Sequence, residues 1–296
     1  MNDPRPPICD YEGSDYQTSF WDQGGRQYED QAESIALQRL LPPKGELLLE
    51  LGAGAGRNTP RYAGFRQVVL LDYSLSQLQQ AVGKLGRSQR YIYVAADIYN
   101  LPFATGLFDT ATMIRTLHHM ADPRAALQQA RQVLQSGATF ILEYANKQNL
   151  KAILRYLTKK QTWSPFSLES VEFEKLNYDF HPRMVRRWLE ETGFMLQQQL
   201  TVSYLRLGIL KRYLSLSLLT RLEARLQPTG NRCQFSPSVF TRSQAIGNNE
   251  KAGPGKFFKC PVCHGDEFRP FGSRLNCENC GREWPIREGI FDFRVS

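Results

Sequence analysis

Short apolar runs alternate with stretches of helical spacing between residues 46 and 144. The runs at residues 47–51, 67–72 and 91–95 are almost continuously apolar, without the polar alternation of a strand that faces water on one side. Such strands are typical of a parallel sheet that is covered by helices on both faces. The pattern therefore predicts a doubly wound, mostly parallel α/β sheet.

Three alternating glycines follow the first run, in the segment Glu50, Leu, Gly52, Ala53, Gly54, Ala, Gly56. Because glycine has no Cβ, the backbone can turn tightly there and approach a ligand closely. The spacing differs from the G-x-G-x-x-G of dinucleotide sites, and a carboxylate at Glu50 would repel a diphosphate but accept hydrogen bonds from an ammonium group. S-adenosylmethionine has an ammonium group and no phosphate.

Two acids follow the next two apolar runs. Asp72 ends the second run, 18 residues after Gly54, where an acceptor for both ribose hydroxyls is expected. Asp97 and Ile98 follow the third run, where they would place a carboxylate at the adenine amino group and an apolar side chain on the ring. Helix capping is the alternative role of both acids, but their positions after successive strands favour the cofactor.

Together these segments resemble the class I S-adenosylmethionine-dependent methyltransferases. The similar segments, in chain order, are residues 50–56, 71–74, 96–103, 108–119 and 133–138. In the last of them Ser136 and Ala138 depart from the family's pattern. The resemblance covers about residues 28–145 and implies a Rossmann-like sheet of seven strands, which residues 194–202 and 238–241 would close as an antiparallel pair.

The resemblance also implies which residues bind S-adenosylmethionine. They are Tyr28, Glu50, Gly52, Ala53, Gly54, Gly56, Asp72, Tyr73, Asp97, Ile98 and Arg115. Methyl transfer is an in-line displacement that depends largely on positioning, so it need not leave a catalytic signature. His118 and His119 are the candidate catalytic residues, and one of them would act as a base on a hydroxyl or amine. A structural histidine at the cofactor rim is the alternative.

The tail carries two Cys-x-x-Cys knuckles that are separated by 13 residues. Their cysteines are Cys260, Cys263, Cys277 and Cys280. Four thiolates on two such turns can surround one tetrahedral Zn²⁺, and so small a core needs the ion to stay folded. We therefore predict a zinc site rather than disulfides, which a cytoplasmic compartment disfavours.

Residues 284–290, together with the knuckles, resemble the small zinc-ribbon protein that activates several RNA and protein methyltransferases as a separate subunit. The resemblance implies that this chain carries its activator in cis or uses the ribbon for docking. A generic ribbon that binds nucleic acid, or that only stabilises the C-terminus, is the competing interpretation.

These patterns divide the chain into four parts. Residues 1–27 are expected to be a flexible arm, 28–242 the methyltransferase domain with substrate-recognition elements at 147–235, 243–256 a linker, and 257–296 the zinc ribbon. Aromatic and basic residues near the end of the arm would fold over the cofactor as a lid, or only pin the arm to the domain. They are Phe20, Trp21, Arg26 and Tyr28.

The net charge of +8 is concentrated after the cofactor half, because residues 147–250 contain 16 Lys and Arg but 8 Asp and Glu. A basic surface can bind RNA or another acidic partner. Within this region, residues 205–226 interleave leucines with basic residues, as in a substrate lid, a membrane-contacting helix or, more commonly, an amphipathic helix packed on a sheet. No run of 18 apolar residues and no signal sequence is present, which predicts a cytoplasmic protein.

We therefore expect an S-adenosylmethionine-dependent methyltransferase whose acceptor is a small apolar metabolite. The leucine-rich segment supports this acceptor, as does the similarity of the core to quinone- and small-metabolite-modifying methyltransferases. The ribbon and the basic region favour tRNA, rRNA or protein instead. A non-catalytic cofactor-binding module is a third hypothesis, against which the intact Glu50, glycine loop, Asp72 and Asp97 count.

Overall fold

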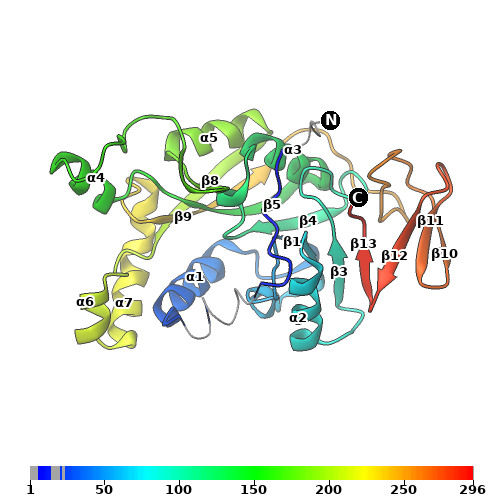
Figure 1. The fold of residues 1–296 in the computed structure, drawn as a ribbon, viewed down its shortest axis with the longest axis horizontal. Helices are drawn as coiled ribbons and strands as arrows, with labels where there is room; N and C mark the ends of the chain where they lie inside the picture. The colour runs from blue at the N-terminus through cyan, green and yellow to red at the C-terminus, as the bar shows by residue number, and fades with distance from the viewer. Residues whose placement is uncertain (1–5, 15–20, 22–23, 296) are drawn as a thin grey trace.

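One large sheet organises the chain in the computed structural model, which describes residues 6–14, 21 and 24–295. Its strand order is β10-β11-β12-β13-β3-β2-β1-β4-β5-β9-β8 (Figure 1). The central strands are β1 (Gly45–Leu51), β2 (Phe65–Asp72), β3 (Tyr91–Ala95), β4 (Phe108–Met113), β5 (Leu134–Ala145), β8 (Phe194–Val202) and β9 (Ser238–Ala245). The first five pair in parallel, and β9 pairs antiparallel with both β5 and β8, so the predicted mostly parallel, doubly wound fold is confirmed.

The expectation of seven strands is wrong for the sheet as a whole. Four further strands from the C-terminal segment extend it beyond β3. They are β10 (Phe268–Phe271), β11 (Arg274–Cys277), β12 (Glu283–Arg287) and β13 (Ile290–Asp292). β13 pairs in parallel with β3, which would otherwise be an edge strand with unpaired backbone groups. The cysteine-rich segment therefore continues the sheet.

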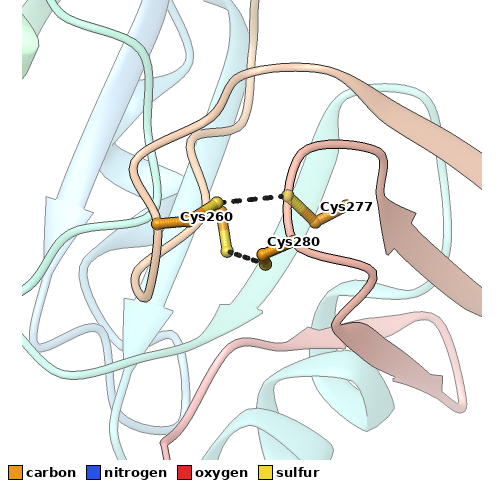
Figure 2. Close-up of side chains that lie close together, drawn as sticks. Cys260, Cys277 and Cys280 are labelled. Carbon is orange, nitrogen blue, oxygen red and sulfur yellow. Dashed lines mark hydrogen bonds between the residues drawn. The ribbon is translucent and has the colours of Figure 1, made fainter.

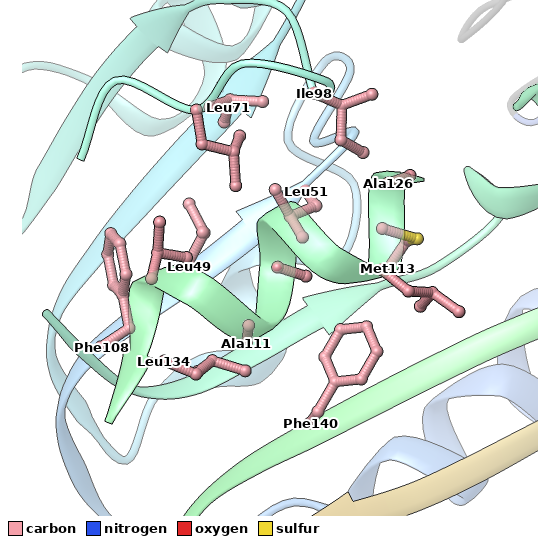
Figure 3. Close-up of a cluster of buried hydrophobic side chains, with 14 of the residues drawn as sticks. Leu49, Leu51, Leu71, Ile98, Phe108, Ala111, Met113, Ala126, Leu134 and Phe140 are labelled. Carbon is pink, nitrogen blue, oxygen red and sulfur yellow. The ribbon is translucent and has the colours of Figure 1, made fainter. Parts of the chain in front are cut away.

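Helices cover both faces of the sheet. On one face lie α1 (Gln27–Leu40), α2 (Leu75–Leu85) and the 3₁₀ helix η2 (Thr59–Tyr62), and on the other lie α3 (Pro123–Val133) and α5 (Pro182–Glu191). Leu49 and Leu51 of β1 belong to the larger core together with Ala126 of α3 (Figure 3), whereas Leu48 packs on the opposite face. This two-sided burial explains why the strands read as continuous apolar runs.

The region between β5 and β9 is less compact. It contains α4 (Leu150–Leu157), the hairpin β6 (Val171–Glu174) and β7 (Asn177–Asp179), α6 (Gly208–Tyr213), α7 (Leu216–Leu226) and the 3₁₀ helix η4 (Gln227–Asn231). The leucine-rich segment at 205–226 thus forms two helices, of which α7 packs against α1 while α6 buries none of its residues. Among the described residues, no helix has both the length and the apolarity needed to cross a bilayer.

The C-terminal strands share an aromatic core with the main sheet. Phe258 lies within 5 Å of the ring centres of both Phe291 and Phe293, and it stacks on Phe103, which precedes β4. Before this cluster, the backbone of residues 246–257 is hydrogen bonded to residues 104–106 and to Ser136. The tail is therefore joined to the sheet along two stretches of chain.

The N-terminal arm contacts the start of α2 where it is described. The carboxylate of Glu12 accepts hydrogen bonds from the backbone N–H groups of Leu75 and Ser76, in the first turn of α2. An anionic group is stabilised there by the exposed N–H groups and the helix dipole. Phe20, which was expected to contribute to a lid, lies outside the described residues.

Candidate functional site

The carboxyl ends of β1, β2, β3 and β4 open onto one cavity of about 140 Å³. Ligands of parallel α/β sheets bind at this edge, because the loops that follow the strands converge there. The cavity is lined by seven of the predicted cofactor residues: Gly52, Ala53, Gly54, Asp72, Tyr73, Ile98 and Arg115. His119 also lines it. Tyr28, Glu50, Gly56, Asp97 and His118 are not among the lining residues.

The glycine loop follows β1 directly. Gly52 has a φ of 71°, and a Cβ at this position would lie 2.1 Å from Oγ1 of Thr116. Gly54 also has a positive φ, and a Cβ there would meet no atom closer than 3.9 Å. Gly52 is therefore required for packing against the loop after β4, whereas Gly54 is required for its backbone conformation.

Asp72 ends β2 and faces the glycine loop. Its carboxylate accepts hydrogen bonds from the backbone N–H of Gly54 (2.8 Å) and of Ser74 (2.9 Å). Burial raises the pKa of Asp72, and these two hydrogen bonds oppose that shift. Each carboxylate oxygen has a second lone pair, so the side chain can still accept hydrogen bonds from two neighbouring hydroxyl groups.

Ile98 and Asp97 occupy different surroundings although they are adjacent in sequence. Ile98 lines the cavity, whereas the Asp97 side chain is buried and one of its oxygens accepts a hydrogen bond from the backbone N–H of Tyr99. Tyr73 lies on the cavity wall beside Asp72. The apolar and aromatic walls at this end suit a planar ring.

Glu50 points to the α1 and α2 face of the sheet. Its carboxylate accepts hydrogen bonds from Thr59 (2.6 Å) and Tyr62 (3.3 Å), and only 4% of the residue is exposed. Burial raises the pKa of Glu50 to about 7. In this arrangement Glu50 ties the end of β1 to η2, the helix that follows the glycine loop.

Two arginines that line the cavity, Arg57 and Arg115, are paired with one buried acid behind them. Glu33 of α1 is completely buried and accepts hydrogen bonds from Arg57 and Arg115, each at 2.6 Å. Burial alone would raise the pKa of Glu33, but the two guanidinium groups hold it below its usual range. The Trp21 ring lies 3.6 Å from the Arg57 guanidinium and 4.8 Å from that of Arg115, within the range of cation–π contacts.

Tyr28 and Gly56 serve the packing around the cavity. The hydroxyl of Tyr28 donates to Glu223 of α7 (2.5 Å) and accepts from the backbone N–H of Leu205 (3.0 Å). Tyr28 thus ties α1 to the segment around α7. A Cβ on Gly56 would lie 2.9 Å from Leu85 of α2, so this glycine allows the loop to lie close to that helix.

The two adjacent histidines have different surroundings. His118 is half-buried, and its Nδ1 atom is buried without a hydrogen-bond partner among the described residues. His119 lines the cavity and is held at both ring nitrogens, with the Leu176 carbonyl 3.0 Å from Nδ1 and the Tyr11 hydroxyl 3.0 Å from Nε2. Because a carbonyl only accepts, Nδ1 carries a proton. Burial lowers the pKa of His119 and so favours the neutral imidazole, whose Nε2 lone pair accepts the hydrogen bond of the Tyr11 hydroxyl.

Sequence reasoning missed several cavity residues. Ile8, Cys9 and Tyr11 come from the N-terminal arm, and Met120 follows the second histidine. Arg57 follows the glycine loop immediately, which was a usable signal. The residues of the arm carry no motif, because their position depends on contacts with elements that are far away in the chain.

The four cysteines of the tail converge from two loops (Figure 2). Their sulfur atoms all lie within 4.8 Å of one another, with Cys260 and Cys280 at 3.9 Å and Cys263 and Cys277 at 3.5 Å. Sulfur atoms at Zn–S distances of about 2.3 Å in a tetrahedron are roughly 3.8 Å apart. The donor set is thus compatible with one Zn²⁺, and it lies at the far side of β3 from the cavity.

The topology and the cavity together define a Rossmann-like fold of the class I S-adenosylmethionine-dependent methyltransferases, as the sequence predicted. More specifically, residues 49–142, which are less than half of the chain, match a family described as a methyltransferase domain. The matched stretch contains the glycine loop, Asp72 and both histidines.

Curated relatives are similar to part of the chain. An O-methyltransferase (cnsE) of Penicillium expansum is 37% identical over 109 residues, which are 35% of this chain and 40% of that protein. A demethylmenaquinone methyltransferase of Paenarthrobacter aurescens is 35% identical over 99 residues, 33% of this chain and 38% of its own length. The chain thus spans less than half the length of these two relatives.

A solved structure extends the similarity of fold. It is a complex of the Trm112 methyltransferase activator of Haloferax volcanii with a candidate methyltransferase. The match has a TM-score of 0.55 at 18% identity and covers 78% of this chain and 96% of the other. At this identity the likeness concerns the fold alone.

Proposed function

We propose that this protein transfers a methyl group from S-adenosylmethionine to a hydroxyl group of a small, apolar acceptor. The observation that carries the proposal is a single cavity with the glycine loop and Asp72 on one wall and the Nε2 lone pair of His119 on another. The first wall suits the cofactor, and the second supplies a base. We further propose that residues 147–235 recognise the acceptor.

Several residues would hold the cofactor. Asp72 would accept hydrogen bonds from the ribose hydroxyls, and Ile98 with Tyr73 would contact the adenine ring. Arg115, which lines the cavity, would attract the carboxylate of the amino-acid end. S-adenosylmethionine supplies an electrophilic methyl group on a sulfonium, so the protein's task is to orient a nucleophile and remove its proton.

His119 would accept that proton. Nε2 of His119 would take the proton of the acceptor hydroxyl, while bound S-adenosylmethionine would supply the methyl group and leave as the neutral thioether. The Leu176 carbonyl would orient the ring throughout and stabilise the imidazolium through its bond to Nδ1. Tyr11, whose hydroxyl is 3.0 Å from Nε2, occupies the place that an acceptor hydroxyl would take.

An apolar acceptor is supported by the relatives and by this chain's own surface. The relatives' names include an O-methyltransferase and a demethylmenaquinone methyltransferase, although the matched methyltransferase domain, residues 49–142, covers only the cofactor half of this chain. The elements outside that half expose many large apolar side chains, among them Phe173 of the hairpin whose turn contacts His119. Such surfaces usually mark interaction sites.

The first test is calorimetric titration with S-adenosylhomocysteine. Asp72→Ala should weaken binding by about 1–3 kcal/mol, because charge-assisted hydrogen bonds are lost, while the fold is kept. Asp266→Ala, which removes an exposed carboxylate of the tail, is the matched control and should bind as the wild type does. Absence of binding to the wild type would refute the cofactor assignment.

A second candidate function is methylation of RNA or protein, with the cysteine-rich tail as an activator in cis. The pairing of β13 with β3 favours it, because the tail is thereby built into the sheet that carries the cavity. Radioactive methyl transfer to phenolic acceptors, compared with transfer to tRNA across a salt series, separates the two candidates, since RNA binding weakens steeply with salt. Cofactor binding without transfer to any acceptor class would favour the non-catalytic module.

A further inference from the structure

An apolar surface is exposed around α4, at the end of the molecule opposite the C-terminal strands (Figure 1). We call residues 150–173 the α4 surface. Its exposed large apolar side chains are Leu150, Leu154, Tyr156, Leu157, Phe166, Leu168 and Phe173, which are 37–66% exposed. Of the eight residues of α4, only Ala152 is buried. A surface helix normally covers its apolar face against the protein, and α4 does not.

The exposed side chains form one continuous feature. Leu150, Leu154 and Leu157 are spaced i, i+4 and i+7, so they lie on one face of α4. The rings of Tyr156 and Phe166 are 6.2 Å apart, and this contact joins the helix to the following loop. A second ring contact within the surface, between Trp163 and Phe173, reaches the hairpin of β6 and β7.

Hydrogen bonds from a buried lysine hold the α4 surface in place. The buried side chain of Lys147 donates hydrogen bonds to the Ser167 hydroxyl (2.9 Å) and to the Glu169 carbonyl (2.5 Å). These two bonds fix the loop beyond α4 against the end of β5. The apolar side chains are thus presented outward by an anchored segment.

Positive charge surrounds this apolar face. Residues 144–168 contain five Lys or Arg and no Asp or Glu. Four of these cations are exposed: Lys151, Arg155, Lys159 and Lys160. Across the described ranges 6–14, 21 and 24–295, none of the four forms a salt bridge. The α4 surface therefore combines an apolar stripe with four exposed cations on and just after the helix, while its two acids, Glu169 and Glu172, lie at the hairpin end.

We propose that the α4 surface docks on an anionic lipid bilayer. An amphipathic helix with Leu on one face and Lys or Arg around it lies in the membrane interface, where the leucines enter the acyl boundary and the cations meet lipid phosphates. A second copy of this chain would bring two cationic surfaces together. RNA would satisfy the cations but leave the leucine stripe in water, so the bilayer alone matches both features.

Docking through the α4 surface would also orient the cavity relative to the membrane. Leu176, in the turn of the hairpin that follows the α4 surface, contacts His119 through its carbonyl. Docking would therefore hold the acceptor side of the cavity near the membrane, where an apolar acceptor dissolves. This consequence rests on the proposed function, whereas the docking itself does not.

The test is co-sedimentation of the full chain with vesicles of phosphatidylcholine alone or mixed with phosphatidylglycerol, without cofactor. The wild type should sediment with the anionic vesicles and stay in solution with the neutral ones. The double variant L154Q/L157Q should lose about tenfold or more in partition coefficient, and so should K159Q/K160Q. Phe271→Gln removes a 69% exposed apolar side chain from β10 and should bind as the wild type does.

If the α4 surface binds a second copy of the chain or RNA instead of a bilayer, the results will differ. Equal partition of the wild type and both double variants would overturn the proposal. A dimer in sedimentation velocity that L154Q/L157Q dissolves, without vesicle binding, would assign the surface to a second copy. RNA binding that K159Q/K160Q abolishes and L154Q/L157Q preserves would assign it to RNA. Should the double variant not fold, Leu157→Gln, at a 66% exposed position, repeats the comparison. Loss of cofactor binding would leave these outcomes unchanged, so the two proposals fail separately.

Discussion

Large apolar side chains are buried at one end of the molecule, beyond β3, and exposed at the other end, around α4. Beyond β3, Phe293 and Trp284 are 1% and 2% exposed, because the C-terminal strands fold over the edge and bury them. At the other end, Leu154 and Leu157 of α4 are 52% and 66% exposed. At the first end the chain itself covers the aromatic core, although Phe271 of the outer strand is 69% exposed. The second is apolar and basic, which is the character of a surface that contacts something else.

The two ends of the molecule also differ from the stretch that matches the methyltransferase family. The matched stretch, residues 49–142, lies between the two ends and contains the cavity's glycine loop and Asp72. The α4 surface lies outside it. Cofactor binding can therefore be common to proteins whose acceptors differ, because the acceptor side is built from other elements.

The largest expected effect is on the covered end. Cys277→Ser should release zinc, since the three remaining thiolates cannot complete the tetrahedral site. The chain beyond about residue 256 should then unfold, because metal binding supplies the folding free energy of such tails. Metal content after dialysis and hydrogen exchange of residues 257–295 measure this. Cys233→Ser, outside the cluster, is the control. Stoichiometric zinc retained in Cys277→Ser would contradict the four-cysteine site.

A smaller effect compares the two ends directly. Phe293→Ala should lower the free energy of unfolding by about 3–5 kcal/mol, because it leaves a cavity among the rings of Phe258, Trp284 and Phe268. Leu157→Ala should change it by less than about 0.5 kcal/mol, because the side chain is already exposed. Urea denaturation of both variants measures the contrast. Equal losses would mean that α4 is covered in solution.

The smallest expected effect concerns His119, which the turn between β6 and β7 contacts at the cavity. Burial lowers the pKa of His119, so the acidic limb of kcat/KM should lie at lower pH than the titration of an exposed histidine. Tyr11→Phe removes a hydrogen bond to neutral Nε2 and should move this acidic limb to higher pH by less than about one unit.

The pH dependence of kcat/KM measures both effects. His119→Asn should remove the limb, and His118→Asn should keep it, because His118 does not line the cavity. An unchanged limb in His119→Asn would show that another group titrates.

Much of the cofactor side was predictable from local sequence. The apolar runs predicted β1, β2 and β3, and the alternating glycines marked the loop after β1, because strand burial and backbone freedom depend on a few consecutive residues. The cavity lining includes seven of the predicted cofactor residues. Both Cys-x-x-Cys knuckles converge as their spacing predicted. These features need little information from the rest of the chain.

Only the tertiary structure decided how these parts are joined. It placed β13 beside β3, so the tail became part of the sheet, and it distinguished His119 from its neighbour by a carbonyl 57 positions away in the chain. It also paired Glu33 with two arginines and left α4 uncovered. Each of these depends on contacts between segments far apart in sequence, which hydrophobic periodicity and motif spacing do not specify.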